Sequence, residues 1–303
     1  MVSGETYSKT AQERNSGSRP AMPFLCELAG KIYKQHPRLD AVTIIFPNRR
    51  AILYFKKYLN DLLSKPAFAP RLLTIEDFIS DFSDYKIPDK LELIHRLYTA
   101  YHDVTLMGNP EEIESFDQFY FWGDMLLRDF DEVDKYMIDA QQLFKDLSHQ
   151  KELDASFDFL TEEQQKFLKD FWGNFDEGQS ANKRKFIHVW RKLAQVYHTF
   201  KDQLIAERLA YDGMMHKAVA EKLKADPTLT ADMHKGSMHF AGFNALTRAE
   251  EHIIAFFVEK GIADVHWDID EYYVNNITQE AGKFFREYQQ HPILGKTFPA
   301  DIP

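Results

Sequence analysis

The spacing of apolar residues alternates between two periods in the first part of the chain. Residues 24–35 carry apolar side chains at helical intervals, and residues 42–46 form a continuous run rich in β-branched residues. Such a run is typical of a strand buried on both faces of a parallel sheet. Residues 50–64 return to helical spacing, and residues 71–73 are expected to form a short strand. This alternation of helix and strand predicts an α/β fold.

The predicted helix over residues 50–64 is expected to bury a broad apolar face. Its apolar residues are Ile52, Leu53, Tyr54, Leu59, Leu62 and Leu63. After the short strand that follows, Thr74 is a favourable N-cap and Asp77 stands at the third helical position. This spacing predicts another helix with an arrangement close to a capping box.

The middle of the chain, residues 88–230, is predicted to be helical almost throughout. Four of its stretches repeat apolar residues with a period of 3.6. They are "KLELIHRLYTAYHDV", "SFDQFYFWGDMLLRDFDEVDKYM", "EEQQKFLKDFWGNF" and "KRKFIHVWRKLAQVYHTFKDQLIAERLA". We therefore expect an all-α insertion that divides an α/β domain into two parts, residues 23–87 and residues 231–303.

An α/β pattern returns after the helical stretch. Residues 238–243 are expected to form a strand, Thr247 to cap a helix that Gly261 ends, and residues 263–270 to form a further strand. This order indicates a parallel crossover, so we predict one doubly wound parallel sheet interrupted by the insertion. A proline-rich stretch directly follows the last helical pattern. We expect the second α/β part, residues 231–303, to be truncated at its C-terminal end.

Charge and cysteine content narrow the class of protein. The formal net charge of the 303-residue chain is -10, whereas dedicated nucleic-acid binders are usually basic. Any DNA contact must therefore be local or be completed by another chain. A single cysteine, Cys26, fits a reducing compartment.

Residues 1–22 lack the apolar core of a signal peptide and are expected to be a disordered leader or an artefact of expression or start site. No apolar run is long enough to span a bilayer, and we expect a cytoplasmic protein without membrane contact.

Two arginines follow the first predicted strand. In the stretch "FPNRR", the strand ends at Pro47 and Asn48, and Arg49 and Arg50 open the next helix. Ligands usually bind at the carboxyl ends of parallel strands, and a helix N-terminus favours an anion by about 0.3–1 kcal/mol when exposed. Asn48, Arg49 and Arg50 are therefore candidate contacts for DNA phosphates, with a structural role for this turn as the alternative. Two or three such contacts predict weak binding in isolation.

No catalytic or nucleotide-binding residue is predicted, and we expect no cofactor in this chain. Residues 29–32, "AGKI", are the nearest match to a phosphate loop, but they lie inside a predicted helix and Ile32 replaces the Mg²⁺-binding hydroxyl. The strand in "SMHFAGF" ends without the carboxylate that holds Mg²⁺ in a P-loop ATPase. Residues 84–86 fit the D-x-K part of a nuclease motif but lie in a predicted loop. The 12 histidines include no H-E-x-x-H.

Two acidic features leave alternatives open. Asp268 and Asp270 follow the last predicted strand, where paired carboxylates either bind Mg²⁺ or remain solvated at a sheet edge. They are the weak metal candidates of an alternative function, a stand-alone metal-dependent hydrolase or transferase. Residues 126–139, "LLRDFDEVDKYMID", form the densest acidic stretch. They are either the solvated face of a helix or a surface that docks a partner subunit, as in a protein-interaction module.

Seven segments of the chain, in this order, resemble the N-terminal region of AddB/RexB-type proteins of the Bacteroidetes form, members of the PD-(D/E)xK nuclease family. The segments are "VTIIFPNRRAILYFKKYL", "LLTIEDFI", "FYFWGDMLLRDFDEVDKYM", "FLTEEQQKFLKDFW", "VWRKLAQVYHTFKDQLIAERLAYDGMM", "HFAGFNALTRAEEHII" and "VHWDIDEYY". The resemblance covers nearly all of residues 24–288. It implies a P-loop-helicase-like fold of superfamily I whose ATPase has decayed. The family's nuclease domain lies far C-terminal of such a region and is absent from this chain.

The resemblance also implies a function. The chain would be a non-catalytic DNA-binding scaffold in a recombination nuclease that processes double-strand breaks. Its partners would be DNA, expected to be single-stranded, and an AddA-like helicase–nuclease subunit. In this family the turn with Asn48, Arg49 and Arg50 corresponds to a helicase segment near single-stranded DNA. The stretch "HFAGFNALTRAEE" takes the place of the metal-binding acidic motif.

Overall fold

A four-stranded parallel sheet lies at the centre of the α/β part. The computed structural model describes residues 22–106, 115–148, 180–230, 237–300 and 302. The strands have the order β2-β1-β3-β4 in the sheet. They are β1 (Thr43–Phe46), β2 (Arg71–Thr74), β3 (Met238–Ala241) and β4 (Ala263–His266). The predicted α/β class is thus confirmed, and β1, the strand expected to be buried on both faces, pairs with a neighbour on each side.

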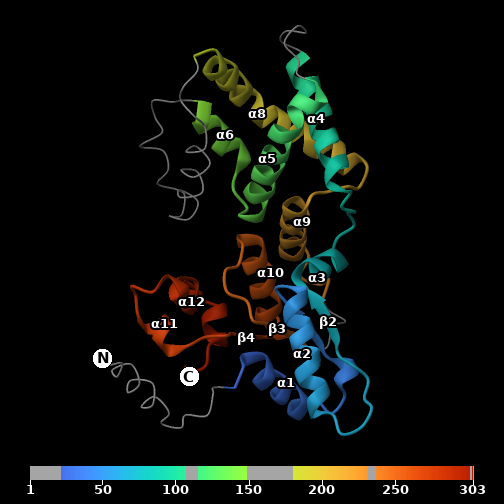
Figure 1. Ribbon diagram of the computed structural model, residues 1–303, viewed down its shortest axis with the longest axis vertical. Helices are drawn as coiled ribbons and strands as arrows, with labels where there is room; N and C mark the ends of the chain where they lie inside the picture. The colour runs from blue at the N-terminus through green and yellow to red at the C-terminus, as the bar shows by residue number, and fades with distance from the viewer. Residues whose placement is uncertain (1–21, 107–114, 149–179, 231–236, 301, 303) are drawn as a thin grey trace, which may run out of the picture.

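Helices cover both faces of this sheet (Figure 1). α1 (Phe24–Gln35) and α2 (Arg49–Leu62) pack on the face to which β1 presents Ile44 and Phe46. α3 (Ile75–Asp81) and α10 (Arg248–Glu259) pack on the opposite face. There the ring of Phe78 lies 5.4 Å from that of Phe240 and 5.3 Å from that of Phe257. Because side chains alternate between the two faces of a strand, the apolar run of β1 supplies both layers.

The chain leaves the sheet after α3 and returns to it at β3. Between them lie α4 (Lys90–Leu106), α5 (Phe116–Lys135), α6 (Ala140–Ser148), α8 (Ser180–Ala206) and α9 (Asp212–Ala225), above the sheet in Figure 1. α5 packs on α4 and α9, whereas α9 also packs on α10 and α3. One hydrophobic cluster therefore runs from these helices into one face of the sheet. The predicted helix in "EEQQKFLKDFWGNF" lies outside the described residues.

The segment after β4 packs against the end of that strand. It contains α11 (Glu271–Asn275), α12 (Lys283–Gln290) and the 3₁₀ turn η4 (Leu294–Thr297). The Trp267 ring stacks at 5.5 Å on Tyr288 and at 5.0 Å on Phe298, and its Nε1 donates to Thr297 Oγ1. None of the helices in the described ranges is long and apolar enough to cross a membrane.

Element boundaries differ from the sequence prediction where a backbone feature intervenes. The capping box of Thr74 and Asp77 is present at the start of α3. α2 begins at Arg49 because Asn48 takes the N-cap position, and it ends at Leu62. β3 ends at Ala241 rather than at residue 243, since Gly242 turns the backbone with a φ of 73°. β4 ends at His266, so residues 267–270 lie outside the strand.

The contact between α9 and α5 depends on a glycine, which gives a first prediction. A Cβ on Gly213 would lie 2.1 Å from the backbone oxygen of Asp131. Gly213→Ala is therefore expected to force the two helices apart and to lower the free energy of unfolding by about 1–3 kcal/mol, as overpacking does. The measurement is the urea midpoint followed by circular dichroism.

Gly30→Ala provides the matched control for this prediction. Gly30 lies within α1, and a Cβ there would meet nothing within 4 Å. Alanine favours a helix interior over glycine, so we expect this variant to be as stable as the parent protein or more so. Equal midpoints for the two variants would show that α9 tolerates a side chain at Gly213.

Candidate nucleic-acid interface

The strand order creates a switch point between β1 and β3. β1 is followed by α2 on one face of the sheet, whereas β3 is followed by α10 on the other face. The two connections therefore diverge between the carboxyl ends of these neighbouring strands. In open α/β sheets, ligands bind in the crevice at such a point. The residues placed there are Pro47 to Arg49 after β1 and Gly242 to Asn244 after β3.

The three residues proposed from the sequence as DNA contacts lie together at this switch point. Asn48 Oδ1 accepts a hydrogen bond from the backbone N–H of Ala51 at 3.0 Å, so this side chain has a structural role as the N-cap of α2. Arg49 and Arg50 are exposed, and neither makes a hydrogen bond or ion pair with any described residue. The unpaired N–H groups of a helix N-terminus and two free guanidinium groups favour an anion at this position.

The sequence prediction for the apolar face of α2 was wrong at three positions. Leu53 is 67% exposed, Tyr54 50% and Leu62, the last residue of the helix, 40%, whereas Phe55 and Leu59 carry the buried face. A helix turns by about 100° per residue, so Leu53 and Tyr54 lie on the opposite side from Phe55 and Leu59. Lys56 is also exposed on this outer side, and a helical projection of the sequence would have revealed the grouping.

The two acidic candidates after β4 lie in different surroundings. Asp268 lies at the surface, and partial desolvation of its carboxyl together with the nearby Glu27 raises its pKa. Asp270 is the N-cap of α11, and its Oδ1 accepts a hydrogen bond from the N–H of Tyr272 at 2.8 Å. Among the residues that the structure describes, no three His, Cys, Asp or Glu side chains are placed to hold one metal ion.

The acidic stretch in α5 turns partly inward. Asp134 is completely buried and accepts hydrogen bonds from the hydroxyls of Tyr197 and Tyr211. Its carboxylate also lies 2.9 Å from Lys201 Nζ and 3.1 Å from Lys217 Nζ. Burial alone would raise the pKa of Asp134, but the two lysines and the two hydroxyls outweigh burial and lower it. Asp134 is thus neither a solvated charge nor part of a docking surface.

Another carboxyl of the same stretch titrates near neutrality. Asp129 is half-buried on α5, and burial raises its pKa to about 7. Arg128 opposes this shift, whereas Glu132 adds to it. The acidity of residues 126–139 is therefore weaker at neutral pH than the number of carboxyl groups in the sequence indicates.

Three histidines form a hydrogen-bonded row on the α1 side of the sheet, which sequence analysis did not detect. His239 Nε2 lies 3.1 Å from His36 Nε2, and His239 Nδ1 lies 3.1 Å from His266 Nε2. Lys31 Nζ lies 3.4 Å from His266 Nδ1. An ammonium group only donates, so a consistent row has Lys31 donating to His266, His266 to His239, and His239 to His36. The nitrogens point at one another, which makes this row a hydrogen-bond chain.

Burial keeps the inner two histidines of this row neutral. It lowers the pKa of His239 to about 4, with further lowering by His36 and Lys31 and partial opposition from Asp264. It lowers the pKa of His266 to about 3, and Lys31 is the next contributor. His239 and His266 therefore contribute in their neutral forms to the contact of the α1 layer with β3 and β4.

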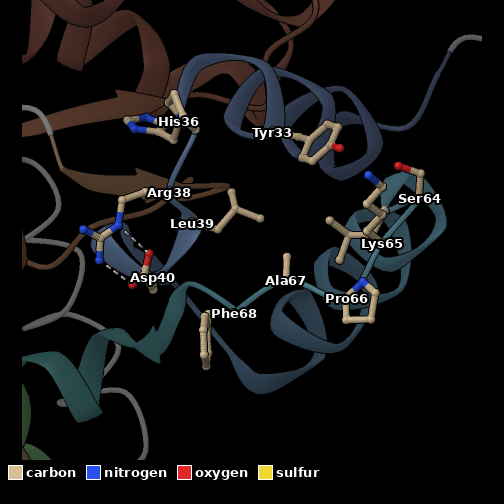
Figure 2. A pocket seen from close by; sticks show the side chains of 12 residues that line it. Tyr33, His36, Arg38, Leu39, Asp40, Ser64, Lys65, Pro66, Ala67 and Phe68 are labelled. Carbon is tan, nitrogen blue, oxygen red and sulfur yellow. Dashed lines mark hydrogen bonds and ion pairs between the residues drawn. The ribbon is translucent and has the colours of Figure 1, made fainter.

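A pocket of about 580 Å³ lies at the opposite edge of the sheet from the arginines (Figure 2). It is lined by the end of α1, the turn before β1 and the loop between α2 and β2. Figure 2 shows the ion pair of Arg38 and Asp40 on one side and Ser64 and Lys65 on the other. Ligands of parallel sheets favour the carboxyl edge, so this pocket is a weaker candidate than the switch point.

Comparison with known proteins adds no relative. No protein-family model matches the chain, and no curated protein matches it significantly.

Proposed function

We propose that this chain is a nucleic-acid-binding scaffold that uses Arg49 and Arg50 to hold phosphates of DNA. The observation that carries the proposal is the position of these two exposed and unpaired arginines, at the carboxyl end of β1 beside the switch point. A guanidinium group binds phosphate through several N–H donors in a fixed fork. Arginines used only for folding would be expected to meet carboxylates, as Arg96 does with Glu92 and Glu207.

The proposal assigns no ATP hydrolysis to this chain. Lys31, the lysine of the nearest phosphate-loop match, lies within α1 and approaches His266. The backbone N–H groups of a helix interior are used within the helix, so they are not free to surround a phosphate. β3 is followed by Gly242 and Phe243, which supply no carboxylate for Mg²⁺.

The wider role in this proposal rests on the sequence resemblance. The chain would be the P-loop-helicase-like N-terminal region of an AddB/RexB-type recombination nuclease that takes part in double-strand-break processing. An AddA-like helicase–nuclease subunit would be its partner, and nuclease chemistry would belong to a domain beyond this chain. Fold-level analogy alone does not establish function, so the test addresses the arginines directly.

The test compares two pairs of arginine substitutions. The double variant Arg49→Gln with Arg50→Gln is expected to bind a fluorescein-labelled (dT)₁₅ more weakly than the parent protein. Each phosphate contact contributes about 0.7 to the salt dependence of single-strand binding, so the slope of log K against log salt should fall by about 1.4. Fluorescence anisotropy at several salt concentrations measures both quantities.

Arg128→Gln with Arg208→Gln is the control because it removes the same charge from exposed positions in the helical part. The control is expected to bind as the parent protein does. An unchanged affinity and slope in the Arg49 and Arg50 variant would reject the proposed function.

A further inference from the structure

The outer face of α2 carries a group of exposed cations and apolar side chains. The exposed residues are Arg49, Arg50, Leu53, Tyr54, Lys56 and Lys57. They lie within less than half of the helix circumference, opposite the buried Phe55 and Leu59. Residues spaced three or four apart are neighbours on a helix surface, so Tyr54 lies between Arg50 and Lys57. We call this group the α2 ridge.

The ridge is positive in an otherwise acidic chain. The net charge is -10, yet the ridge combines four cations, and Asp61 is the single acidic residue of α2. None of the four cations makes an ion pair or hydrogen bond with a described residue. Other exposed cations do pair, for example Arg71 with Asp81 and Lys222 with Asp84. Charge complementarity therefore favours a polyanion as the occupant of the ridge.

An exposed tyrosine among the cations favours one class of polyanion. Tyr54 makes no ring contact with a described residue, and its ring is free to take a stacking partner. Proteins that bind single strands combine cations that follow the backbone with aromatic rings on which bases stack. Bases in a duplex already stack on one another, so Tyr54 would gain little from double-stranded DNA.

A membrane surface fits the ridge less well. A helix that binds a lipid surface inserts a wide apolar face between the headgroups. The wide apolar face of α2, with Phe55 and Leu59, is already packed against the sheet. Only Leu53 and Tyr54 remain exposed as apolar groups among the cations.

We propose that a single-stranded nucleic acid runs along the α2 ridge, with its phosphates on the four cations and a base stacked on Tyr54. This inference rests on the proposed function, which requires only Arg49 and Arg50. The distance along the helix from Arg49 to Lys57 is about 12 Å, at about 1.5 Å per residue. This length accommodates about three to four steps of a stacked strand. Tyr54 is then the residue that makes the site prefer single strands over duplex.

The first experiment tests stacking on Tyr54. Tyr54→Ala is expected to weaken the binding of labelled (dT)₁₅ about fivefold or more, the lower limit for loss of one base–aromatic stack. Tyr54→Phe keeps the ring and is expected to bind as the parent protein does. Tyr33→Ala, which removes a part-exposed tyrosine from the neighbouring helix α1, is the control and should leave the affinity unchanged. None of the three substitutions should change the affinity of the protein for a 15-base-pair duplex.

The second experiment tests the lysines. Lys56→Gln with Lys57→Gln is expected to reduce the salt slope for (dT)₁₅ by about 1.4, at about 0.7 per phosphate. Lys34→Gln with Lys224→Gln removes the same charge from exposed positions on α1 and α9 and should leave the slope unchanged.

The outcomes separate this inference from the proposed function. If the Arg49 and Arg50 variant binds (dT)₁₅ weakly while the Tyr54 and lysine variants match the parent protein, the ridge is rejected and the proposed function stands. If the parent protein does not bind (dT)₁₅ at low salt, both are rejected. Equal loss of duplex and single-strand affinity in Tyr54→Ala would overturn the role of stacking. Sedimentation with phosphatidylserine vesicles that depends on the ridge, without (dT)₁₅ binding, would overturn the inference in favour of a lipid surface.

Discussion

Asp134→Asn is expected to lower the free energy of unfolding by about 3–5 kcal/mol, the range found when one partner of a buried ion pair is removed. The Asp134 carboxylate is completely buried and is the shared acceptor for two ammonium groups and two hydroxyls. The side chains of Lys201 and Lys217 are only 18% and 21% exposed. Asparagine has nearly the same shape but no charge, so both ammonium groups would stay largely buried without a counter-charge.

The expected loss of unfolding free energy is large because side chains from the three helices α5, α8 and α9 meet at this carboxylate. Asp134 belongs to α5, Lys201 to α8 and Lys217 to α9. The charge of Lys217 already disfavours that of Lys201, and loss of the negative charge would leave this repulsion uncompensated. Burial already lowers the pKa of Lys201 against the attraction of Asp134. In the variant we expect a lysine in this cluster to lose its proton or to move toward solvent.

Urea-induced unfolding at pH 7 measures this effect, and Asp202→Asn is its matched control. Asp202 lies in α8 next to Lys201 but is exposed, and we expect its substitution to change the free energy of unfolding by less than about 0.5 kcal/mol. A decrease below about 1 kcal/mol in Asp134→Asn would show that the carboxylate contributes no more than an exposed charge.

Asp134 also illustrates what the sequence could not predict. The stretch "LLRDFDEVDKYMID" has helical periodicity, and α5 does span it. An aspartate in such a stretch is most often solvated, because an unpaired buried charge is unfavourable. Asp134 is buried because its partners come from residues 197–217, more than sixty positions away. Pairing over such a distance leaves no local signal.

The candidate interface was more accessible to sequence analysis. The β-branched run before "FPNRR" predicted a strand buried on both faces, and Asn48 at the start of α2 is a favourable N-cap residue. These local rules placed Arg49 and Arg50 at a strand end correctly. The outer face of α2 was missed because leucine and tyrosine were assigned to the buried side by type. Their exposure follows from helical geometry relative to Phe55 and Leu59, which pack against the sheet.

The histidine row is expected to make the protein lose stability as the pH falls below about 6.5. An unfolded histidine takes up a proton near pH 6.5, whereas burial holds the pKa of folded His239 at about 4. The unfolded state therefore binds more protons between these two values, and the free energy of unfolding decreases as the pH falls through this window. A difference of about 2.5 pKa units corresponds to about 3 kcal/mol by pH 4.

The direction of hydrogen bonding within the row explains why a proton is not accepted inside the fold. His239 Nδ1 accepts from His266, and its Nε2–H donates to His36, so both nitrogens are already committed. Protonation of His239 would place two N–H donors face to face at His266. Of the charged groups around the row, Asp264 of β4 favours the proton, whereas Lys31 of α1 opposes it. Lys296 and Glu259, from η4 and α10, lie further out in the pocket beside His266.

His239→Gln isolates this contribution from other titrating groups. Asp129 acts in the opposite direction, because a carboxyl whose folded pKa is raised to about 7 takes up its proton before the unfolded chain does and gains stability as the pH falls. The measurement is therefore the difference between two curves of unfolding free energy against pH.

Urea unfolding of the parent protein and of His239→Gln is recorded from pH 7.5 to pH 5. The glutamine side chain keeps a donor and an acceptor but does not titrate. We expect the variant to be less stable than the parent at pH 7.5 and the gap to narrow by about 1–2 kcal/mol at pH 5. The curve of the control His95→Gln, at an exposed position in α4, should run parallel to that of the parent protein. A constant gap between the curves of His239→Gln and the parent would mean that His239 is protonated as readily in the folded protein as in the unfolded chain.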